Sequence, residues 1–332
     1  MLYAMTKIKA LAMFSGGLDS ILAVKLIQSQ GINVEALNFG GFFCSCKSAN
    51  CAAEAAKKLR VPLRTVEVDK RYLKMLRNPK YGYGRNINPC VDCKIFMLKE
   101  GKKYAKKIGA SFVFTGEVLG ERPKSQHYPA LRAIEEDAGL KGRLLRPLSA
   151  KLLPETVVEK GGLVNRDKLL SIKGRSRKPQ MALAKELGIR DFPAPAGGCL
   201  LTEIEFAKRL RDLCQHRKRF SVRDVALLRL GRHFRLGENK IIVGRNEKEN
   251  KALVVGKNVS DYVFEVSVFP GPVTILQGKK TRKAVKAAAE LTASYSDIKT
   301  GIVTVQFGKD QMVETIMVKA PNRADVEKLR LG

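Results

Sequence analysis

Apolar runs and amphipathic stretches alternate along the first third of the chain. An apolar run at residues 7–14 is followed by the amphipathic ILAVKLIQSQ, the strand pattern INVEALNF, the helical AAEAAKKLR and a further strand pattern, VPLRTVEV. A helical stretch from about Cys93 to Ile108 then leads into SFVFTGEV. This strand–helix alternation is typical of a parallel sheet with helices on both faces, so we predict an α/β domain here.

The pattern changes in the last third of the chain. Short strand patterns (KIIVGR, YVFEVSVF, VTILQG, GIVTVQF and QMVETIMVK) surround helical stretches near 246–255 and 280–294. We therefore predict an α/β domain over residues 1–219 and a smaller α+β domain over residues 220–332. No apolar run has the length of a membrane span, and the N-terminal run leads directly into a glycine turn, so we expect a cytoplasmic protein with no membrane partner.

The charge of the chain indicates that this globular protein binds a polyanion. The sequence has 62 Lys and Arg against 32 Asp and Glu, a formal net charge of +30. The excess is not confined to a tail, because residues 201–332 alone hold 26 basic and 15 acidic side chains. A solvated lysine-rich surface is the alternative, but such surfaces usually balance lysine with glutamate. We expect a nucleic acid partner.

The first glycine turn has the chemistry of a phosphate site. Ser15-Gly16-Gly17-Leu18-Asp19-Ser20 follows the first predicted strand and opens the first predicted helix. Two glycines let the backbone approach an anion closely, and the amides at a helix N-terminus can cradle it. An aspartate in such a turn is best explained by a divalent cation that bridges it to phosphates. An ordinary capped strand–helix turn is the structural alternative.

SGGLDS resembles the SGGxDS signature of the PP-loop ATP pyrophosphatases, which cleave ATP between the α and β phosphates and leave AMP on a substrate oxygen. The resemblance implies ATP, Mg²⁺ near Asp19, and nucleotide contacts from Ser15, Gly16, Gly17, Asp19 and Ser20. Phe39 and Gly116 end two predicted strands at the edge where open parallel sheets bind ligands. We hold them as candidates for adenine or ribose contacts or, equally, as core and turn residues.

Cysteines supply a second candidate chemistry. Cys90 and Cys93 form a CxxC at the start of a predicted helix, where the helix dipole lowers a thiol pKa. Cys199 lies on a glycine-rich turn in PAGGCLL. These thiols are open to several interpretations: half of a zinc site, a redox pair, or buried thiols. Cys44, Cys46 and Cys51 form a further group whose role is open.

NPCVDC and PAGGCLL resemble the paired cysteine motifs of the tRNA-thiolating branch of the PP-loop superfamily, and GEVLGERPKSQH and LRPLSAKLLPETV also resemble that group. In one part of the branch, Cys90 and Cys199 would be a nucleophile and a persulfide carrier. In another, residues matching Cys90, Cys93 and Cys199 hold a 4Fe-4S cluster. The complete triad favours the cluster, with the persulfide as its alternative and structural zinc or idle thiols as the remaining interpretation.

The C-terminal part, over about residues 238–308, resembles the RNA-binding domain of the NFACT proteins, most clearly at Gly244-Arg245-Asn246. Val-Phe-Glu-Val at 263–266 stands where that family usually has a histidine-containing run, so a catalytic role there is doubtful and a clamp role survives. We expect RNA contacts from Arg245 and from the basic turn that contains Arg175, Arg177 and Lys178.

Together these features predict an ATP-dependent tRNA sulfurtransferase, in which a uridine carbonyl oxygen is adenylated and then replaced by sulfur. The partners would be tRNA and a sulfur donor, either free sulfide or a cysteine desulfurase or sulfur carrier. Position 2 or 4 of the base and a homodimeric assembly are left open. The alternatives are a PP-loop ligase or amidating enzyme that acts on a small acid, and an RNA-binding protein with a degenerate ATP site.

Overall fold

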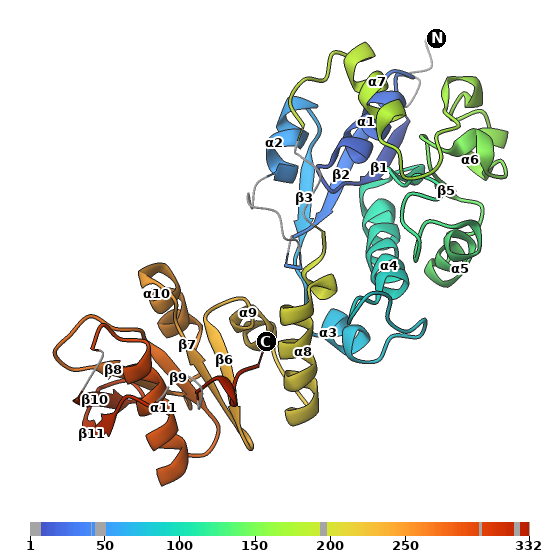
Figure 1. Cartoon of the computed structure of the whole chain (residues 1–332). Coiled ribbons are helices and arrows are strands. Elements are labelled where there is room, and N and C mark those ends of the chain that lie inside the picture. Colours follow the sequence, from blue (N-terminus) through green and yellow to red (C-terminus); the bar gives the residue numbers. More distant parts are fainter. Residues whose placement is uncertain are drawn as a thin grey trace. The chain divides into compact units, whose positions relative to one another are not determined.

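The computed structural model describes residues 8–40, 42–43, 51–192, 198–298, 301–321 and 326–331. The chain divides into two compact units, residues 1–200 and 201–332 (Figure 1). The division falls before helix α8 (Ile204–His216), whereas the expected boundary at 219/220 lies after it. Asp212 on α8 pairs with Arg235 of the second unit, which explains why this helix groups with the residues that follow it.

The N-terminal unit contains a five-stranded parallel sheet in the order β3-β2-β1-β4-β5. Its strands are β1 (Lys9–Met13), β2 (Asn33–Phe39), β3 (Leu63–Val66), β4 (Phe112–Thr115) and β5 (Leu144–Leu145). Buried apolar side chains on β1, β2 and β4 leave both faces of the sheet in need of cover.

Helices cover both faces, as the strand–helix alternation predicts. One face carries α1 (Leu18–Gln28), α2 (Cys51–Lys58) and α7 (Lys178–Glu186), whose apolar side chains share one core. The other face carries α4 (Cys90–Ile108) and α5 (Tyr128–Ala138). The remaining helices of this unit are α3 (Lys70–Arg77), α6 (Val157–Lys160) and the short 3-10 turns at Ala150–Leu152 and Arg166–Lys168. The α/β fold class is confirmed.

The strand order of the parallel sheet predicts where a ligand would bind. β1 lies between β2 and β4, so the chain leaves the carboxyl ends of β1 and β4 toward different helices. A crevice forms at such a switch point in open parallel sheets. The loop before α1 and the Thr115–Glu117 segment both follow strands at this edge, so the fold brings the glycine turn and the end of β4 together.

The C-terminal unit is built on a six-stranded antiparallel sheet in the order β11-β10-β8-β9-β7-β6. Its strands are β6 (Arg232–Leu236), β7 (Asn239–Val243), β8 (Tyr262–Val266), β9 (Thr274–Gln277), β10 (Ile302–Gly308) and β11 (Glu314–Lys319). The long helix α11 (Arg282–Ser294) packs on one face, and α9 (Val222–Leu227) and α10 (Glu247–Gly256) contribute to a smaller core with β7 and β9. The predicted α+β class is confirmed. Among the described residues, no helix is both long and apolar enough to cross a membrane.

Candidate nucleotide and sulfur site

The glycine turn after β1 is closed by its own hydroxyls and packed against α2. Ser15 Oγ donates to Ser20 Oγ at 3.2 Å, and Ser20 Oγ donates to the Gly17 carbonyl oxygen at 2.8 Å. Gly16 has φ +78°, and a Cβ there would lie 2.7 Å from the Ala52 Cα. Only glycine satisfies both demands, so the turn's shape is fixed by packing as well as by conformation.

Gly116 also allows two segments of backbone, the end of β4 and the start of α1, to approach each other closely. A Cβ at this position would lie 2.6 Å from the Asp19 carbonyl carbon and from the Ser20 amide nitrogen. The end of β4 is therefore pressed against the first turn of α1. Phe39 packs partly buried against the core beneath α4. Nucleotide contacts from Phe39 and Gly116 stay predictions.

Asp19 has the features of a cation ligand. Its Oδ1 atom is buried and has no hydrogen-bond partner among the residues that the structure describes. Burial raises the pKa of this carboxyl, while the nearby Arg177 charge and the Gln180 amide lower it. Gln180 is fully buried, and neither polar atom of its side chain makes a hydrogen bond of ordinary geometry. Buried polar atoms without partners require an explanation, and a carboxylate oxygen of this kind fits Mg²⁺.

The basic turn at the start of α7 lies partly at the same loop. Arg177 precedes the first residue of α7 and acts electrostatically on both Asp19 and Glu121. Arg175 and Lys178 are exposed. The structure therefore brings Arg177 to the nucleotide loop, and RNA contacts from Arg175, Arg177 and Lys178 stay predictions.

Cys90, Cys93 and Cys199 are brought into one neighbourhood although a hundred residues separate the last two. The pKa of the Cys93 thiol is raised to about 12, chiefly by burial; the Tyr72 hydroxyl opposes this shift, and the nearby Cys90 and Cys199 sulfurs add to it. The Tyr72 hydroxyl donates to Cys93 Sγ at 3.2 Å. The Cys90 thiol donates to Ser125 Oγ at 3.1 Å.

Aromatic contacts join the segments that carry these cysteines. The Phe43 ring stacks on the Tyr72 ring with centroids 5.6 Å apart, and Phe96 of α4 meets the same ring edge-on at 5.4 Å. The Phe43 carbonyl oxygen accepts from the Leu200 amide at 2.8 Å, directly after Cys199. Tyr72 thus connects α3, α4 and the Cys199 segment.

The CxxC sequence also contains a structural aspartate. Asp92 is buried between the two cysteines, and its carboxylate accepts from the Lys80 amide at 2.8 Å and from the Tyr81 amide at 3.0 Å. A carboxylate that accepts two backbone N–H groups fixes the preceding loop against the start of α4. This contact holds Cys90 and Cys93 in place.

Within the part of the chain that the structure describes, no group of three or more His, Cys, Asp or Glu side chains is placed to hold a metal ion. A 4Fe-4S cluster on Cys90, Cys93 and Cys199 therefore stays a prediction, with the persulfide as its alternative. Cys51 lies at the start of α2, beside Gly16, and Cys44 and Cys46 lie outside the described residues.

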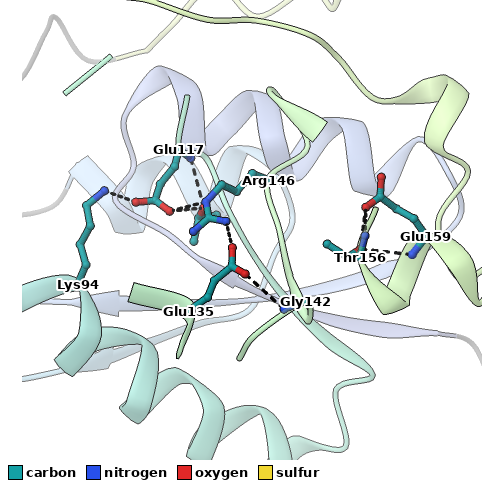
Figure 2. Close-up of polar contacts among 8 residues, drawn as sticks. Lys94, Glu117, Glu135, Gly142, Arg146, Thr156 and Glu159 are labelled. Atoms are coloured by element: carbon teal, nitrogen blue, oxygen red, sulfur yellow. Dashed lines mark hydrogen bonds and ion pairs between the residues drawn. The ribbon is translucent and has the colours of Figure 1, made fainter. Parts of the chain in front are cut away.

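A buried chain of charges that the sequence analysis missed lies beside this site (Figure 2). Lys94 forms an ion pair with Glu117, which also accepts from Arg146 Nε at 3.0 Å and from Thr115 Oγ1 at 3.2 Å. Arg146 in turn pairs with Glu135. Burial raises the pKa of Glu117, but the Lys94 and Arg146 charges outweigh it and lower the pKa to about 2. The only sequence signal is that Glu117 and Arg146 lie in GEVLGERPKSQH and LRPLSAKLLPETV.

In the C-terminal unit, the Gly-Arg-Asn turn is explained by its own contacts. Arg245 pairs with Glu249 at 2.9 Å, and the Asn246 side chain caps α10 by accepting from the Glu249 amide at 3.0 Å. A Cβ on Gly244 would lie 2.0 Å from Asn250 Oδ1. An RNA contact from Arg245 stays a prediction.

Comparison with known families agrees with this division. Residues 5–152 match the family model described as thiamine biosynthesis protein (ThiI), and residues 231–330 match that of the NFACT protein RNA binding domain. Both resemblances seen in the sequence, to the tRNA-thiolating branch of the PP-loop superfamily and to the NFACT domain, are confirmed by these matches and by the relatives below.

Relatives that match over most of both chains are named tRNA-specific 2-thiouridylases. The protein from Clostridium botulinum (strain Alaska E43) is 23% identical over 344 residues, which cover 93% of this chain and 91% of its own length. That from Pediococcus pentosaceus is 23% identical over 347 residues, covering 96% and 90%. A solved complex of a 4-thiouridine synthetase with RNA and ATP is 21% identical with a TM-score of 0.34, covering 55% of this chain and 51% of that one.

Proposed function

We propose that this protein is an ATP-dependent tRNA sulfurtransferase. Its N-terminal unit matches the tRNA-thiolating branch of the PP-loop superfamily, and its C-terminal unit matches an RNA-binding family. The observation that carries the proposal is the convergence of two chemistries in one unit. The phosphate-binding turn with Asp19 follows β1, Cys90 and Cys93 lie in the first turn of α4, and Cys199 acts electrostatically on Cys93 from a distant segment. A simple ATP hydrolase or a small-acid ligase needs only the first.

The first step is activation of a uridine carbonyl oxygen. Oxygen is a poor leaving group, so it must be converted to a phosphate ester before sulfur can replace it. The backbone amides of the turn and the hydroxyls of Ser15 and Ser20 would hold the pyrophosphate end of ATP. Mg²⁺ held by Asp19 would screen the phosphate charges. Attack of the uridine oxygen on the α-phosphorus then releases pyrophosphate and leaves AMP on the base.

The second step is delivery of sulfur from a cysteine. We derive the persulfide route, which needs only two thiols: Cys199 carries the transferable sulfur and Cys90 is the second thiol. A cluster on Cys90, Cys93 and Cys199 is the alternative. The terminal persulfide sulfur attacks the activated carbon and AMP leaves. The Cys90 thiolate then attacks the Cys199 sulfur, which frees the thiolated base and forms a Cys90–Cys199 disulfide that a small-molecule thiol reduces. Iron bound stoichiometrically to anaerobically purified protein would contradict this route.

Charge supports the RNA substrate. The formal net charge of +30 favours binding of a polyanion through release of counterions. The target base must leave its stack to reach the site, which costs a few kcal/mol and requires contacts with the surrounding RNA backbone. We assign these contacts to the basic surface of both units, including Arg175 and Lys178 in the first unit and the NFACT-like second unit.

The adenylation step can be tested without sulfur. Parent protein incubated with ATP, Mg²⁺ and unmodified tRNA is expected to form AMP and pyrophosphate, and Asp19→Asn is expected to lower the rate about 100-fold because it removes the cation ligand. Asp137→Asn is the matched control, since Asp137 lies on α5 and forms an ion pair with the exposed Lys80. The proposal fails if parent protein forms no AMP with any tRNA pool, or forms it equally well with a small acid and no RNA.

A further inference from the structure

The two ends of the Lys94–Glu117–Arg146–Glu135 chain are more exposed than its middle, and Lys94 is the cationic end. The side chain of Arg146 is 2% exposed and that of Glu117 is 10% exposed, whereas that of Lys94 is 19% exposed. Figure 2 shows Lys94 at one end of the chain, with Glu117 between it and Arg146. Glu135, at the other end, is 17% exposed but is a carboxylate, so Lys94 is the exposed member that can bind an anionic ligand.

The rest of the chain holds Lys94 in place. Glu117 accepts from Arg146 and Thr115 as well as from Lys94, so its carboxylate cannot turn away without breaking three contacts. Glu135 holds Arg146 from the far side and accepts from the Gly142 amide at 3.3 Å. Buried ion pairs add little net stability compared with apolar packing, so stability alone does not account for four charged groups here.

Lys94 also has unused donors. An ammonium group has three N–H donors, and Glu117 is its one hydrogen-bond partner among the described residues. Two donors are therefore left for a ligand with acceptor oxygens. A rigidly held cation with free donors is suited to a phosphate oxygen.

The position of Lys94 indicates which phosphate of ATP its ammonium group would contact. It follows Cys93 directly in α4, and its counterion Glu117 follows Gly116, the residue pressed against Asp19 and Ser20. Lys94 acts electrostatically on Cys93 and, on the other side, on Glu121, which also responds to Asp19 and Arg177. Lys94 thus lies between the cysteines and the turn that would hold the pyrophosphate. In the proposed reaction the atom between those two groups is the α-phosphorus.

We propose that Lys94 is a catalytic residue that donates to a non-bridging oxygen of the α-phosphate and is positioned for this by Glu117 and Arg146. The inference rests on the proposed function for its choice of substrate, but its test does not require thiolation. The same contact would persist on AMP, whose only phosphate is the α-phosphate, and would be absent from adenosine.

The test is the ratio of the adenosine and AMP dissociation constants, measured by calorimetry on the full chain. Lys94→Met is expected to weaken AMP binding about 10-fold or more while adenosine binding changes less than about 3-fold, because a charge-assisted hydrogen bond is lost only with AMP. Lys94→Arg is expected to retain most of the preference for AMP. Lys99→Met, which removes an exposed lysine five residues further along α4, is the matched control and should match the parent.

Two results would overturn the inference. One is an unchanged preference for AMP in Lys94→Met, and the other is an equal loss of AMP and adenosine binding, which a merely structural role would give. If Lys94→Met does not fold, Lys94→Gln, which can still hydrogen-bond Glu117, provides the same comparison. Failure of tRNA thiolation with an intact AMP effect would instead count against the proposed function and leave the Lys94 contact standing.

Discussion

At the scale of single residues, two glycines of the site are required by neighbouring backbone before any ligand is considered. Gly16 faces the first turn of α2, and Gly116 faces the first turn of α1. In each case a methyl group would lie well inside contact distance of main-chain atoms that cannot move independently. The shape of the nucleotide turn therefore depends on the packing of three elements.

Substitution at Gly116 tests this dependence. Gly116→Ala is expected to destabilise the protein by about 1–3 kcal/mol through overpacking and to weaken AMP binding, because the start of α1 must shift. Gly17→Ala is the control for folding, since a Cβ there meets only Ser15 Oγ at 3.5 Å and φ is −78°. Urea unfolding of both variants is the measurement. Equal stability of Gly116→Ala and the parent would show that the contact is not rigid.

Residues differ in how far the sequence could assign them. Asp19 and the three cysteines are found by motif, because their chemistry needs a particular residue type beside a turn or at a helix start. Lys94 could not be found this way, since its partners Glu117 and Arg146 come from separate segments and an isolated lysine has no distinctive spacing. Arg245 is recognisable as part of a motif, but its ion pair with Glu249 appears only in the fold.

At the scale of elements, the buried charge chain joins α4, the end of β4 and the segment after β5. Glu117 is the central member, with a pKa lowered from 4.5 to about 2. A lowered carboxyl pKa stabilises the fold at pH values above the unfolded pKa. That contribution is lost as the pH falls from about 4.5 toward 2. The shift corresponds to about 3 kcal/mol.

Glu117→Gln should remove this pH dependence. The parent is expected to lose stability relative to Glu117→Gln as the pH is lowered from 6 to 3, so that the difference between the two proteins narrows. Glu54→Gln, at an exposed position on α2, is the control and should follow the parent. Urea unfolding at pH 6, 4.5 and 3, followed by circular dichroism, is the measurement. A constant difference across this range would contradict the assigned role of Glu117.

Elements were predicted where their pattern is strong. The seven alternating segments of the N-terminal unit predict four strands of the parallel sheet, because buried strands and amphipathic helices have different periods, whereas the two-residue strand β5 was not predicted. Strand β6 was missed, since the two arginines in Arg-His-Phe-Arg-Leu leave no alternation of apolar and polar residues, and the polar His233 is fully buried where it pairs with β7. Helix α5 was missed because it lies in a stretch rich in charge and glycine.

At the scale of the whole molecule, one basic chain combines a unit to which we assign nucleotide and sulfur chemistry with a unit that matches an RNA-binding family. The first unit carries the reactive groups, and the second carries no cysteine except Cys214 on α8. Helix α8 groups with the second unit through the Asp212–Arg235 pair. This contact joins segments that are distant in the sequence, so no local sequence pattern predicts it. The sequence therefore predicted two domains but placed their boundary on the other side of this helix.

The most direct test of the account is mass analysis of the nucleosides from tRNA treated with this protein, ATP, Mg²⁺, a thiol reductant and a persulfide-forming sulfur donor. The account predicts a uridine in which one oxygen is replaced by sulfur, formed by the parent and by Cys214→Ser and not by Cys199→Ser. Unmodified tRNA from the parent reaction, or an equal yield from Cys199→Ser, would contradict it.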